Sequence, residues 1–347
     1  MSVICVDPCT NPLWLRLAEQ HPSSVFNSPN WLRVVVDTYG LEMQGYVLLD
    51  DAGNPVAGIP VCRVTDFISK RIASMPFSDY CDPLVRDYEQ WRHLVDPLLA
   101  EERPFLIRCL HNNIPSMDDR FTLINKARWH GLNLESDIDT IWSNLHDSSR
   151  RSIKKAQRNG VTVRVAQHKE ELRAFFELHL NVRKRKYRLL AQPYSFFENI
   201  WRHFIEEQKG LLMVAVHQDK IIAGVLYLEW NNELYYKFNA SLQDDLAYRP
   251  NDLLIWEGIK YAKAKNYRRL DFGLSDWDQE GLVRYKRKFA TDEKTISFLR
   301  YIPNEKIPSQ ERQARELLSQ LVQLFTEDDV PNAVTNRAGE ILYRFFI

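Results

Sequence analysis

Cationic side chains are concentrated in three segments of this chain. Between Ser148 and Lys169 there are seven basic residues and no acidic residue. Four of the seven recur at the spacing i, i+3, i+4 and i+7, so a helix would place them on one face: Arg151, Lys154, Lys155 and Arg158. The other two segments are 183–188 (RKRKYR) and 284–288 (RYKRK). Three such segments predict a site for a polyanion such as a phosphorylated substrate, whereas the alternative is a set of solvated helix faces.

The helix expected around residues 170–187 carries a stripe that changes character along its length. Apolar residues occupy this stripe in the first turns, and the same spacing continues to His179, Arg183 and Lys186. A face that turns from phenylalanine to cations is typical of a helix that leaves the core and enters a cleft. These three residues are therefore predicted to bind substrate, with Arg151, Lys154 and Lys155. The alternative is a solvated last turn, where cations also suit the helix dipole.

A further candidate is the helix start at residues 249–254 (RPNDLL). Pro250 in the first turn, with Asn251 or Asp252 as the cap, predicts a firm beginning for this helix. The N–H groups of the first turn, beside Arg249, are suited to hold a phosphate. Arg249 and Asn251 are therefore candidate cofactor-binding residues, although capping alone explains Pro250 and Asn251 equally well.

Composition limits the elements that can position these residues. The 347 residues include 46 Lys and Arg against 46 Asp and Glu, so the net charge is zero, which argues against a surface given over entirely to nucleic acid or membrane. The length fits about two domains, and 45% apolar residues can fill two cores. No apolar run reaches the ~18–20 residues of a membrane span, and no basic segment precedes an apolar run at the N-terminus. We therefore expect a cytoplasmic protein without a secretory signal.

Cysteine, histidine and glycine exclude several kinds of site. The five cysteines form no C-x-x-C pair, and the nine histidines are scattered, so reduced thiols and no metal site are expected. Neither G-x-G-x-x-G nor G-x-x-x-x-G-K-[ST] occurs, which argues against dinucleotide and P-loop chemistry.

The two halves of the chain share an order of features at a nearly constant offset of about 165 residues. Gly58 and Gly224 lie in the second of two apolar runs that a polar turn joins, and each half then continues with a strand, an amphipathic helix and two further strands. The expected helices lie at about 87–100 and 252–265, and the final strands at 121–127 and 295–301. An internal duplication follows, with a mixed α/β (α+β) unit of mostly antiparallel strands in each half.

These features predict three parts of the chain. Residues 1–135 form an N-terminal domain, and residues 136–302, which begin with a helical segment at 136–160, form a C-terminal domain. Residues 303–347 form a helical tail, with a helix at 309–325 and an apolar end that packs back on a domain.

Several of these segments, in this order, resemble the tandem-domain branch of the GNAT acyltransferase superfamily, namely the Fem-like aminoacyltransferases and the BioF2-like acyltransferases. The segments with this resemblance are 26–31 (FNSPNW), 74–80 (SMPFSDY), 149–161 (SRRSIKKAQRNGV), 248–257 (YRPNDLLIWE) and 271–289 from D-F-G to the final phenylalanine. The resemblance implies two tandem GNAT-like domains.

The resemblance also implies transfer of an acyl or aminoacyl group to an amine, with a phosphorylated or lipid-linked cell-envelope precursor as acceptor. No tightly bound cofactor is expected, because the donor, aminoacyl-tRNA or acyl-CoA, is a co-substrate. Such a reaction needs alignment, a proton acceptor and stabilisation of the oxyanion rather than a nucleophilic side chain. Asp79 is the candidate proton acceptor, with Tyr80 beside it at the substrate. Lys286 is the candidate that stabilises the oxyanion, near Asp271 at the donor.

Two departures from the family pattern keep other functions open. The segment 249–254 has the arginine of the [QR]-x-x-G-x-[AG] pattern but neither small residue, which weakens a CoA-dependent reading. The long coiled-coil arm of some Fem-like enzymes has no counterpart, which weakens tRNA use. The alternatives are a CoA-dependent N-acyltransferase acting on a small-molecule amine and a non-catalytic binder of RNA or a phosphorylated glycan. Among partners, peripheral contact with a membrane is a further expectation. The sequence predicts no oligomeric state.

Overall fold

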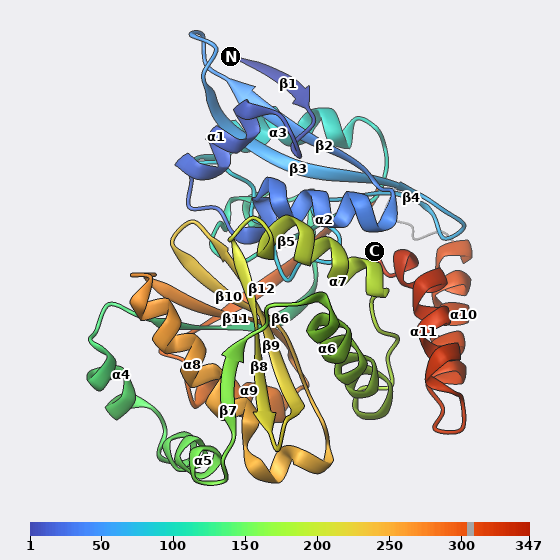
Figure 1. Ribbon diagram of the computed structural model, residues 1–347. Coiled ribbons are helices and arrows are strands. Elements are labelled where there is room, and N and C mark those ends of the chain that lie inside the picture. The colour runs from blue at the N-terminus through green and yellow to red at the C-terminus, as the bar shows by residue number, and fades with distance from the viewer. Residues whose placement is uncertain (304–308) are drawn as a thin grey trace. The chain divides into compact units, whose positions relative to one another are not determined.

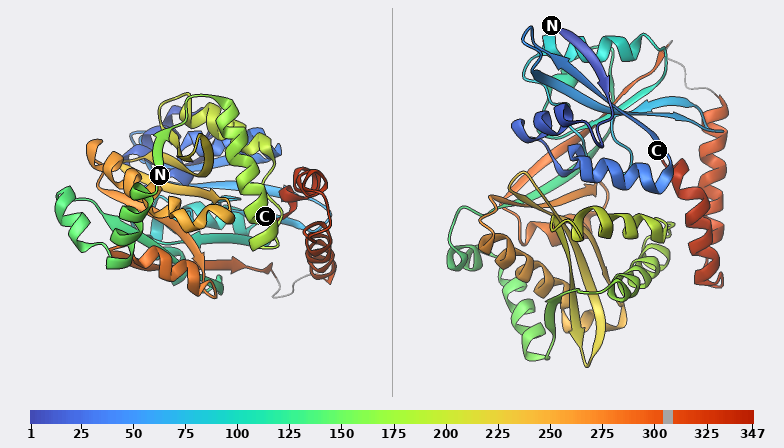
Figure 2. Two further views of the ribbon diagram at one scale, coloured as in Figure 1. Left: turned by 60° about the horizontal axis from the view of Figure 1, so that its bottom comes forward. Right: turned by 45° about the horizontal axis from the view of Figure 1, so that its top comes forward.

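The computed structural model describes residues 1–303 and 309–347. The chain folds into two compact units. The first unit contains Met1–Trp129, Lys294–Leu318 and Arg344–Ile347, and the second contains His130–Glu293 and Ser319–Tyr343. Figure 1 labels the elements of both units, and Figure 2 gives two further views.

The first unit is a mostly antiparallel sheet with helices on both faces. Its strands follow the order β1-β2-β3-β4-β5-β12, in which only β4 and β5 are parallel neighbours. Their bounds are β1 Ser2–Val6, β2 Glu42–Leu49, β3 Pro55–Thr65, β4 Lys70–Ala73, β5 Phe105–Cys109 and β12 Asp292–Tyr301. The helices are α1 Pro12–Gln20, α2 Pro29–Tyr39 and α3 Tyr88–Leu99. The apolar side of α3, with Trp91, Leu94 and Leu98, closes the core over one face of the sheet.

The second unit repeats this arrangement. Its strands follow the order β6-β11-β10-β9-β8-β7, and β10 and β11 are the parallel pair. Strand β6 belongs to this unit only from His130 on. The strand bounds are β6 Thr122–Asn133, β7 Thr162–Val165, β8 Gly210–His217, β9 Lys220–Trp230, β10 Glu233–Ser241 and β11 Arg269–Asp276. The helices are α4 Ile138–Asn144, α5 Asp147–Arg158, α6 Lys169–Asn181, α7 Tyr194–Ile200, α8 Pro250–Ala264, α9 Glu280–Arg287 and α11 Asn332–Leu342. Helix α10, Ser309–Phe325, begins in the first unit and ends in the second. Helices α6 and α7 continue as single π-helical turns at Val182–Lys186 and Trp201–Ile205.

The predicted duplication is confirmed, because equivalent elements follow in the same order and with the same pairing. The series β2-β3-β4-α3-β5 corresponds to β8-β9-β10-α8-β11. Gly58 faces α1, where a Cβ would lie 2.5 Å from Leu17, and Gly224 faces α6, where a Cβ would lie 2.7 Å from Phe175. Each glycine therefore lets a helix approach the middle of its sheet.

The unit boundaries differ from the predicted ones because the last strand of each repeat pairs with strands of the other repeat. Residues 297–301 of β12 pair with β5 in the first unit, and β6, the last strand of the first repeat, neighbours β11. A strand edge that would otherwise have unpaired N–H and C=O groups is thereby covered. The predicted borders at 135/136 and 302/303 lie at 129/130 and 293/294, and the predicted tail is shared, with 319–343 in the second unit.

The expected helix at 309–325 has these bounds in α10. The expected return of the apolar end to a domain is also observed, because Phe345 packs on Phe67 with ring centroids 4.7 Å apart and Ile347 is buried. No helix of the described residues is long and apolar enough to cross a bilayer.

Candidate functional site

The parallel strands of the second unit separate after a short pairing. Only Glu233–Tyr235 of β10 pair with Arg269–Asp271 of β11, although both strands continue for several residues. On β10 the register shifts between Tyr236 and Phe238, and on β11 Gly273 has a positive φ of 66°. A bulge and a left-handed glycine both bend a strand away from its partner. An opening at the carboxyl ends of the two strands follows.

Helix α8 begins beside this opening without a side-chain cap. Arg249 precedes it in the left-handed conformation, with φ 62° and no capping hydrogen bond from its side chain. Asn251 was predicted to hold a phosphate, but its amide group bonds Asn239 (3.2 Å) and Ser241 (3.1 Å) and so ties the helix start to β10. The exposed Arg249 and the first-turn N–H groups remain available for an anion.

A buried carboxylate lies in the first turn of α8. Asp252 is the third residue of the helix, and its side chain is buried. Burial raises the pKa of Asp252 to about 6, and the cations of Lys288 and Arg249 limit this rise. Asp252 is therefore mostly ionised at neutral pH but close enough to its pKa to exchange a proton.

Two buried hydroxyl groups near these elements have no hydrogen-bond partner among the described residues. They are Oη of Tyr285 on α9 and Oγ of Ser275 at the end of β11. Burial, followed by the nearby Asp252, raises the pKa of Tyr285 well above its usual value, so Tyr285 keeps its proton. Buried polar groups without a partner are rare in folded proteins, and they point to a ligand that completes them.

Lys286, the predicted stabiliser of an oxyanion, holds the end of β11. Its side chain is only 5% exposed, and Nζ donates to the carbonyl oxygens of Gly273 (3.1 Å) and Leu274 (2.7 Å). Asp271 is also buried and accepts the N–H of Gly273 at 2.6 Å. Lys286 and Asp271 therefore both act on the backbone turn around Gly273, and the structure gives them a positioning role at the opening.

In the first unit the equivalent opening is filled by the chain itself. Residues 74–84 run beside β5, where the N–H groups of Ser74 and Cys81 donate to the carbonyl oxygens of Leu106 and Arg108, both at 2.9 Å. The buried carboxylate of Asp82 then accepts the N–H groups of residues 110–112 at the end of β5. In the second unit the segment before α8, the 3₁₀ helix Asp244–Tyr248, contains no buried residue, and so it does not fill the opening in this way.

Asp79 and Tyr80 lie in the segment 74–84 of the first unit. Asp79 is half-buried, and Tyr80 is buried with its ring against Phe26 and His111 at centroid distances of 5.3 and 5.6 Å. Tyr80 is therefore a core residue that anchors the segment. Asp79 remains a predicted proton acceptor in the first unit, while Lys286 and Asp271 belong to the second.

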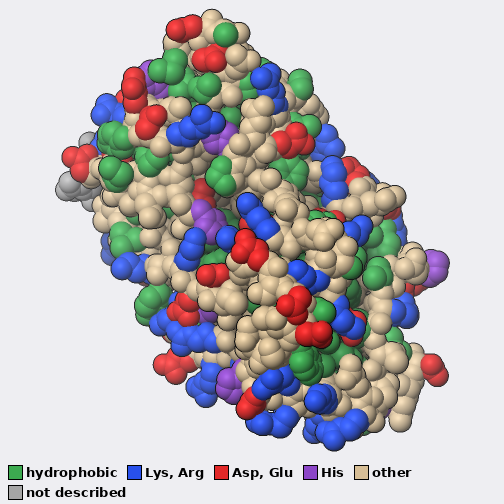
Figure 3. Space-filling model, turned by 90° about the vertical axis from the view of Figure 1, so that its left-hand side faces the viewer, with side chains coloured by type: hydrophobic (Ala, Val, Ile, Leu, Met, Phe, Trp, Pro, Cys, Tyr) green, Lys and Arg blue, Asp and Glu red, His purple; other side chains and the backbone are tan. Residues whose placement is uncertain are grey.

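The predicted cationic stripe of Arg151, Lys154 and Lys155 is exposed on α5. The opposite side of α5 buries Ile153 and Ala156 in the core that α8 also lines. None of the three cations has an ion pair with a described residue, and Nζ of Lys154 lies 5.9 Å from the ring centre of Trp142. Figure 3 shows Lys and Arg side chains gathered at the lower end of the face on which α5 lies.

The prediction that this stripe lies with Arg183 and Lys186 at one substrate site is wrong. Strand β9 turns Gly224 toward α6 and its neighbours Ala223 and Val225 toward the core of α8, so α5 with α8 and α6 cover opposite faces of the sheet. Figures 1 and 2 show α6 and α8 on the two sides of β8–β10. Arg183 and Lys186 lie in the π-helical turn after α6, on the far side from α5.

His179 is a core residue rather than a substrate ligand. Its ring packs among Phe175, Phe197 and Phe238, and Nε2 lies 3.0 Å from Oε1 of Gln192. Burial, and then the cation of Arg183, lowers the pKa of His179 to about 3, so it is neutral. Arg183 donates to the carbonyl of Leu190 at 3.0 Å, and Lys186 is exposed over Tyr187, which fits the alternative of a solvated last turn.

Sequence reasoning named Asp252 only as a possible cap and missed Tyr285 and Ser275. Tyr285 lies inside the cationic segment 284–288, and no feature of the sequence marks its hydroxyl group as one that becomes buried. Among the described residues no group of three or more His, Cys, Asp or Glu side chains is placed to hold a metal ion.

Comparison with protein families gives a match to the acetyltransferase (GNAT) domain over residues 143–287, which contains β7–β11 and α5–α9. FemX has a similar structure at a TM-score of 0.69 and 16% identity, covering 94% of this chain and 100% of FemX. The chain has the Fem-like tandem GNAT fold. No curated protein sequence matches it.

Two further solved structures share this tandem GNAT fold. One is the C-terminal domain of a putative lysylphosphatidylglycerol synthetase from Agrobacterium fabrum, at a TM-score of 0.54 and 12% identity, with 90% of this chain and 94% of that chain covered. The other is a tandem GNAT protein from the clavulanic acid biosynthesis pathway, at 0.54 and 11%, with 88% and 100% covered. The family match shows that most of the second unit is similar to an acetyltransferase (GNAT) domain.

Proposed function

We propose that the second unit transfers an aminoacyl or acyl group to an amine of a cell-envelope precursor. The observation that carries this proposal is the opening between β10 and β11, bordered by the uncapped start of α8 and by the buried carboxylate of Asp252 and the buried hydroxyl group of Tyr285. Such a combination of a polar opening, an ionised acid with a raised pKa and an unsatisfied hydroxyl group is what acyl transfer needs.

The chemistry follows from these groups. The nitrogen of the acceptor amine attacks the carbonyl carbon of the donor, the bond from that carbon to the leaving oxygen or sulfur breaks, and the amine loses a proton. The carboxylate of Asp252 accepts this proton, since its pKa of about 6 leaves it ionised at neutral pH. Oη of Tyr285 donates to the developing oxyanion or to the leaving atom. Lys286 positions the end of β11 through the carbonyls of Gly273 and Leu274.

The first turn of α8 favours an aminoacyl ester over a CoA thioester as the donor. A CoA diphosphate would place several negative charges at the helix start, where Asp252 already has a buried carboxylate. The α-ammonium group of an aminoacyl donor is instead attracted by that carboxylate. Fem-like proteins and a structure named as a lysylphosphatidylglycerol synthetase share this fold, which supports aminoacyl transfer to an envelope acceptor. We propose the exposed stripe of α5 as the surface for the phosphates of the tRNA or of the acceptor.

The test offers the purified full chain charged tRNA or acyl-CoA in turn, with candidate envelope amines, and follows the products by mass spectrometry. An aminoacylated amine formed from charged tRNA, and lost in Asp252→Asn, supports the proposal. Product from acyl-CoA alone would replace it by CoA-dependent N-acyl transfer. Absence of any product, with retained binding of RNA or a phosphorylated glycan, would make the chain a binding protein.

A further inference from the structure

A pocket lined largely by arginines lies in the first unit, on the face of the sheet away from α3. Four arginines line this pocket: Arg71, Arg108, Arg300 and Arg315. Strand alternation explains the arrangement, because Phe105 and Ile107 of β5 pack in the core with α3 and so turn Leu106 and Arg108 to the pocket.

The volume of this pocket is about 210 Å³, whereas a larger pocket of the first unit measures about 380 Å³. The smaller volume lies below the range of about 300–1,000 Å³ that is usual for drug-sized ligands. A small ligand, such as one oxyanion with a short substituent, is of the right size.

The positive charge of the arginines in the pocket exceeds the negative charge of the acidic groups that contact them. Arg71 is paired with Asp66 at 3.0 Å, and its Nε donates to an oxygen of the last residue, Ile347, at 3.2 Å, so Arg71 adds no charge in excess. Arg300 and Arg315 share the single buried carboxylate of Glu311, at 2.9 and 3.1 Å, which leaves one positive charge in excess. The ion pairs of Arg300 use Nη2 and those of Arg315 use Nε, and no hydrogen bond to a described residue uses their remaining N–H groups.

The rest of the lining is apolar. Ala73, Leu106, Ile124 and Phe346 line the wall. Ile124 is 48% exposed on β6, which is unusual for an isoleucine in a strand. A ligand that combines an anion with an apolar portion would cover this wall and neutralise the guanidinium groups at once.

We propose that this pocket binds a phosphate monoester with a short apolar substituent. The four guanidinium groups come from four elements, β4, β5, β12 and α10, so they surround the pocket from several directions. A tetrahedral phosphate uses such donors better than a planar carboxylate does, and its second negative charge strengthens each charge-assisted hydrogen bond. This site lies within the first unit and does not depend on acyl transfer by the second.

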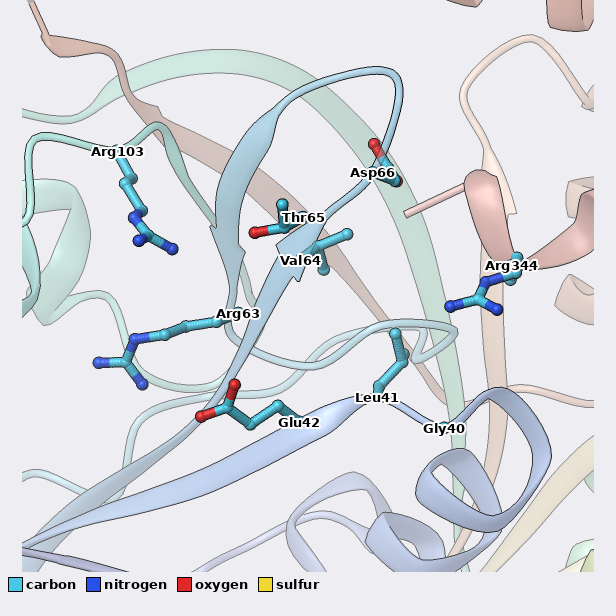
Figure 4. A pocket seen from close by; sticks show the side chains of 9 residues that line it. All are labelled: Gly40, Leu41, Glu42, Arg63, Val64, Thr65, Asp66, Arg103 and Arg344. Carbon is cyan, nitrogen blue, oxygen red and sulfur yellow. The ribbon is translucent and has the colours of Figure 1, made fainter.

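The larger pocket of the first unit is a poorer anion site. It is lined by Arg63, Arg103 and Arg344, but also by the acids Glu42 and Asp66. Figure 4 shows Arg63 and Arg103 on one side and Arg344 on the other. Arg63 is already bonded to Glu101, Gln44 and Tyr46, so most of its N–H groups are used and its charge is balanced by Glu101.

The test is isothermal titration calorimetry of the full chain at low salt with hexyl phosphate, inorganic phosphate and hexanoate. Arg315→Gln removes one pocket cation while Arg300 still satisfies Glu311, and Arg312→Gln is the matched control on the exposed side of α10. Ile124→Glu places a negative charge in the wall, and Leu123→Glu is its control, since Leu123 is 45% exposed, does not line the pocket and points to the other face of β6.

Hexyl phosphate is expected to bind, with a Kd that rises at least about tenfold in Arg315→Gln and Ile124→Glu and stays unchanged in both controls. Tighter binding of dihexanoyl phosphatidic acid, with the same response to the variants, would support a lipid as the source, and weaker binding would support a soluble ester. Equal binding of hexanoate or of inorganic phosphate would overturn the assignment of ligand class. Absence of binding, or equal loss in the controls, would overturn the site.

Discussion

Replacing Lys286 by methionine removes the cation that holds the end of β11. Methionine keeps the apolar stem of the side chain, so packing changes little, but the carbonyls of Gly273 and Leu274 lose their donor. A hydrogen bond to a charged group contributes about 1.5–3 kcal/mol. Because the desolvation of the buried ammonium group is also relieved, we expect a net loss of about 2–4 kcal/mol in the free energy of unfolding.

Urea unfolding, followed by circular dichroism, measures this loss. Arg284→Met is the matched control on the same helix, because Arg284 is exposed and has no ion pair with a described residue, so its substitution should change the free energy of unfolding by no more than about 0.5 kcal/mol. An unchanged stability of Lys286→Met would show that Nζ does not hold the two carbonyls.

The same variant tests the position of the reaction centre. Under conditions where Lys286→Met remains folded, a displaced end of β11 should lower kcat by about 10²–10³ with a smaller change in KM, because the geometry matters most in the transition state. Arg284→Met should retain the normal kcat. A normal kcat in folded Lys286→Met would refute the assignment of the β11 end to the reaction centre.

Three further variants follow from the same geometry. Tyr285→Phe should leave the free energy of unfolding unchanged or higher, since Oη has no partner among the described residues, while lowering kcat at least about tenfold; a normal rate would exclude Oη from the reaction. Because the folded-state pKa of Asp252 is raised from 3.8 to about 6, its contribution to stability falls as pH rises from about 4 to 6, and urea unfolding of Asp252→Asn at pH 4 and 7 should show this decline reduced. Lys154→Glu should weaken tRNA or acceptor binding and lower its salt dependence, and unchanged titrations at two salt concentrations would make α5 a solvated face.

The repeat and the elements of the fold could be predicted from sequence. Apolar periodicity, the polar turns and the paired Gly58 and Gly224 are local signals that a strand or helix carries wherever it packs, and they gave the correct order of β2-β3-β4-α3-β5 and its copy. The exchange of β6 and β12 was not predictable, because a strand pattern states that one face is buried but does not name the neighbour that pairs with it.

The site depended much more on the tertiary structure. The sequence placed Lys286, Asp271 and Arg249 near one another in the chain, and the structure brings their elements to the same end of β11 and α8. The sequence could not show that Nζ of Lys286 binds two carbonyl oxygens, because those bonds depend on the bend at Gly273.

Charge and burial explain the predictions that failed. The helical spacing of His179 and Arg183 is correct, but His179 is enclosed by phenylalanines that come from α6, α7 and β10, so only the packing decides that it is neutral and not a ligand. Likewise, the spacing of Arg151 and Lys154 fixes a shared helix face, while the side of the sheet on which that helix packs separates them from Arg183. A sequence determines which residues share a face of one element, and the tertiary structure decides what that face meets, because burial and charge pairing are set by atoms from distant parts of the chain.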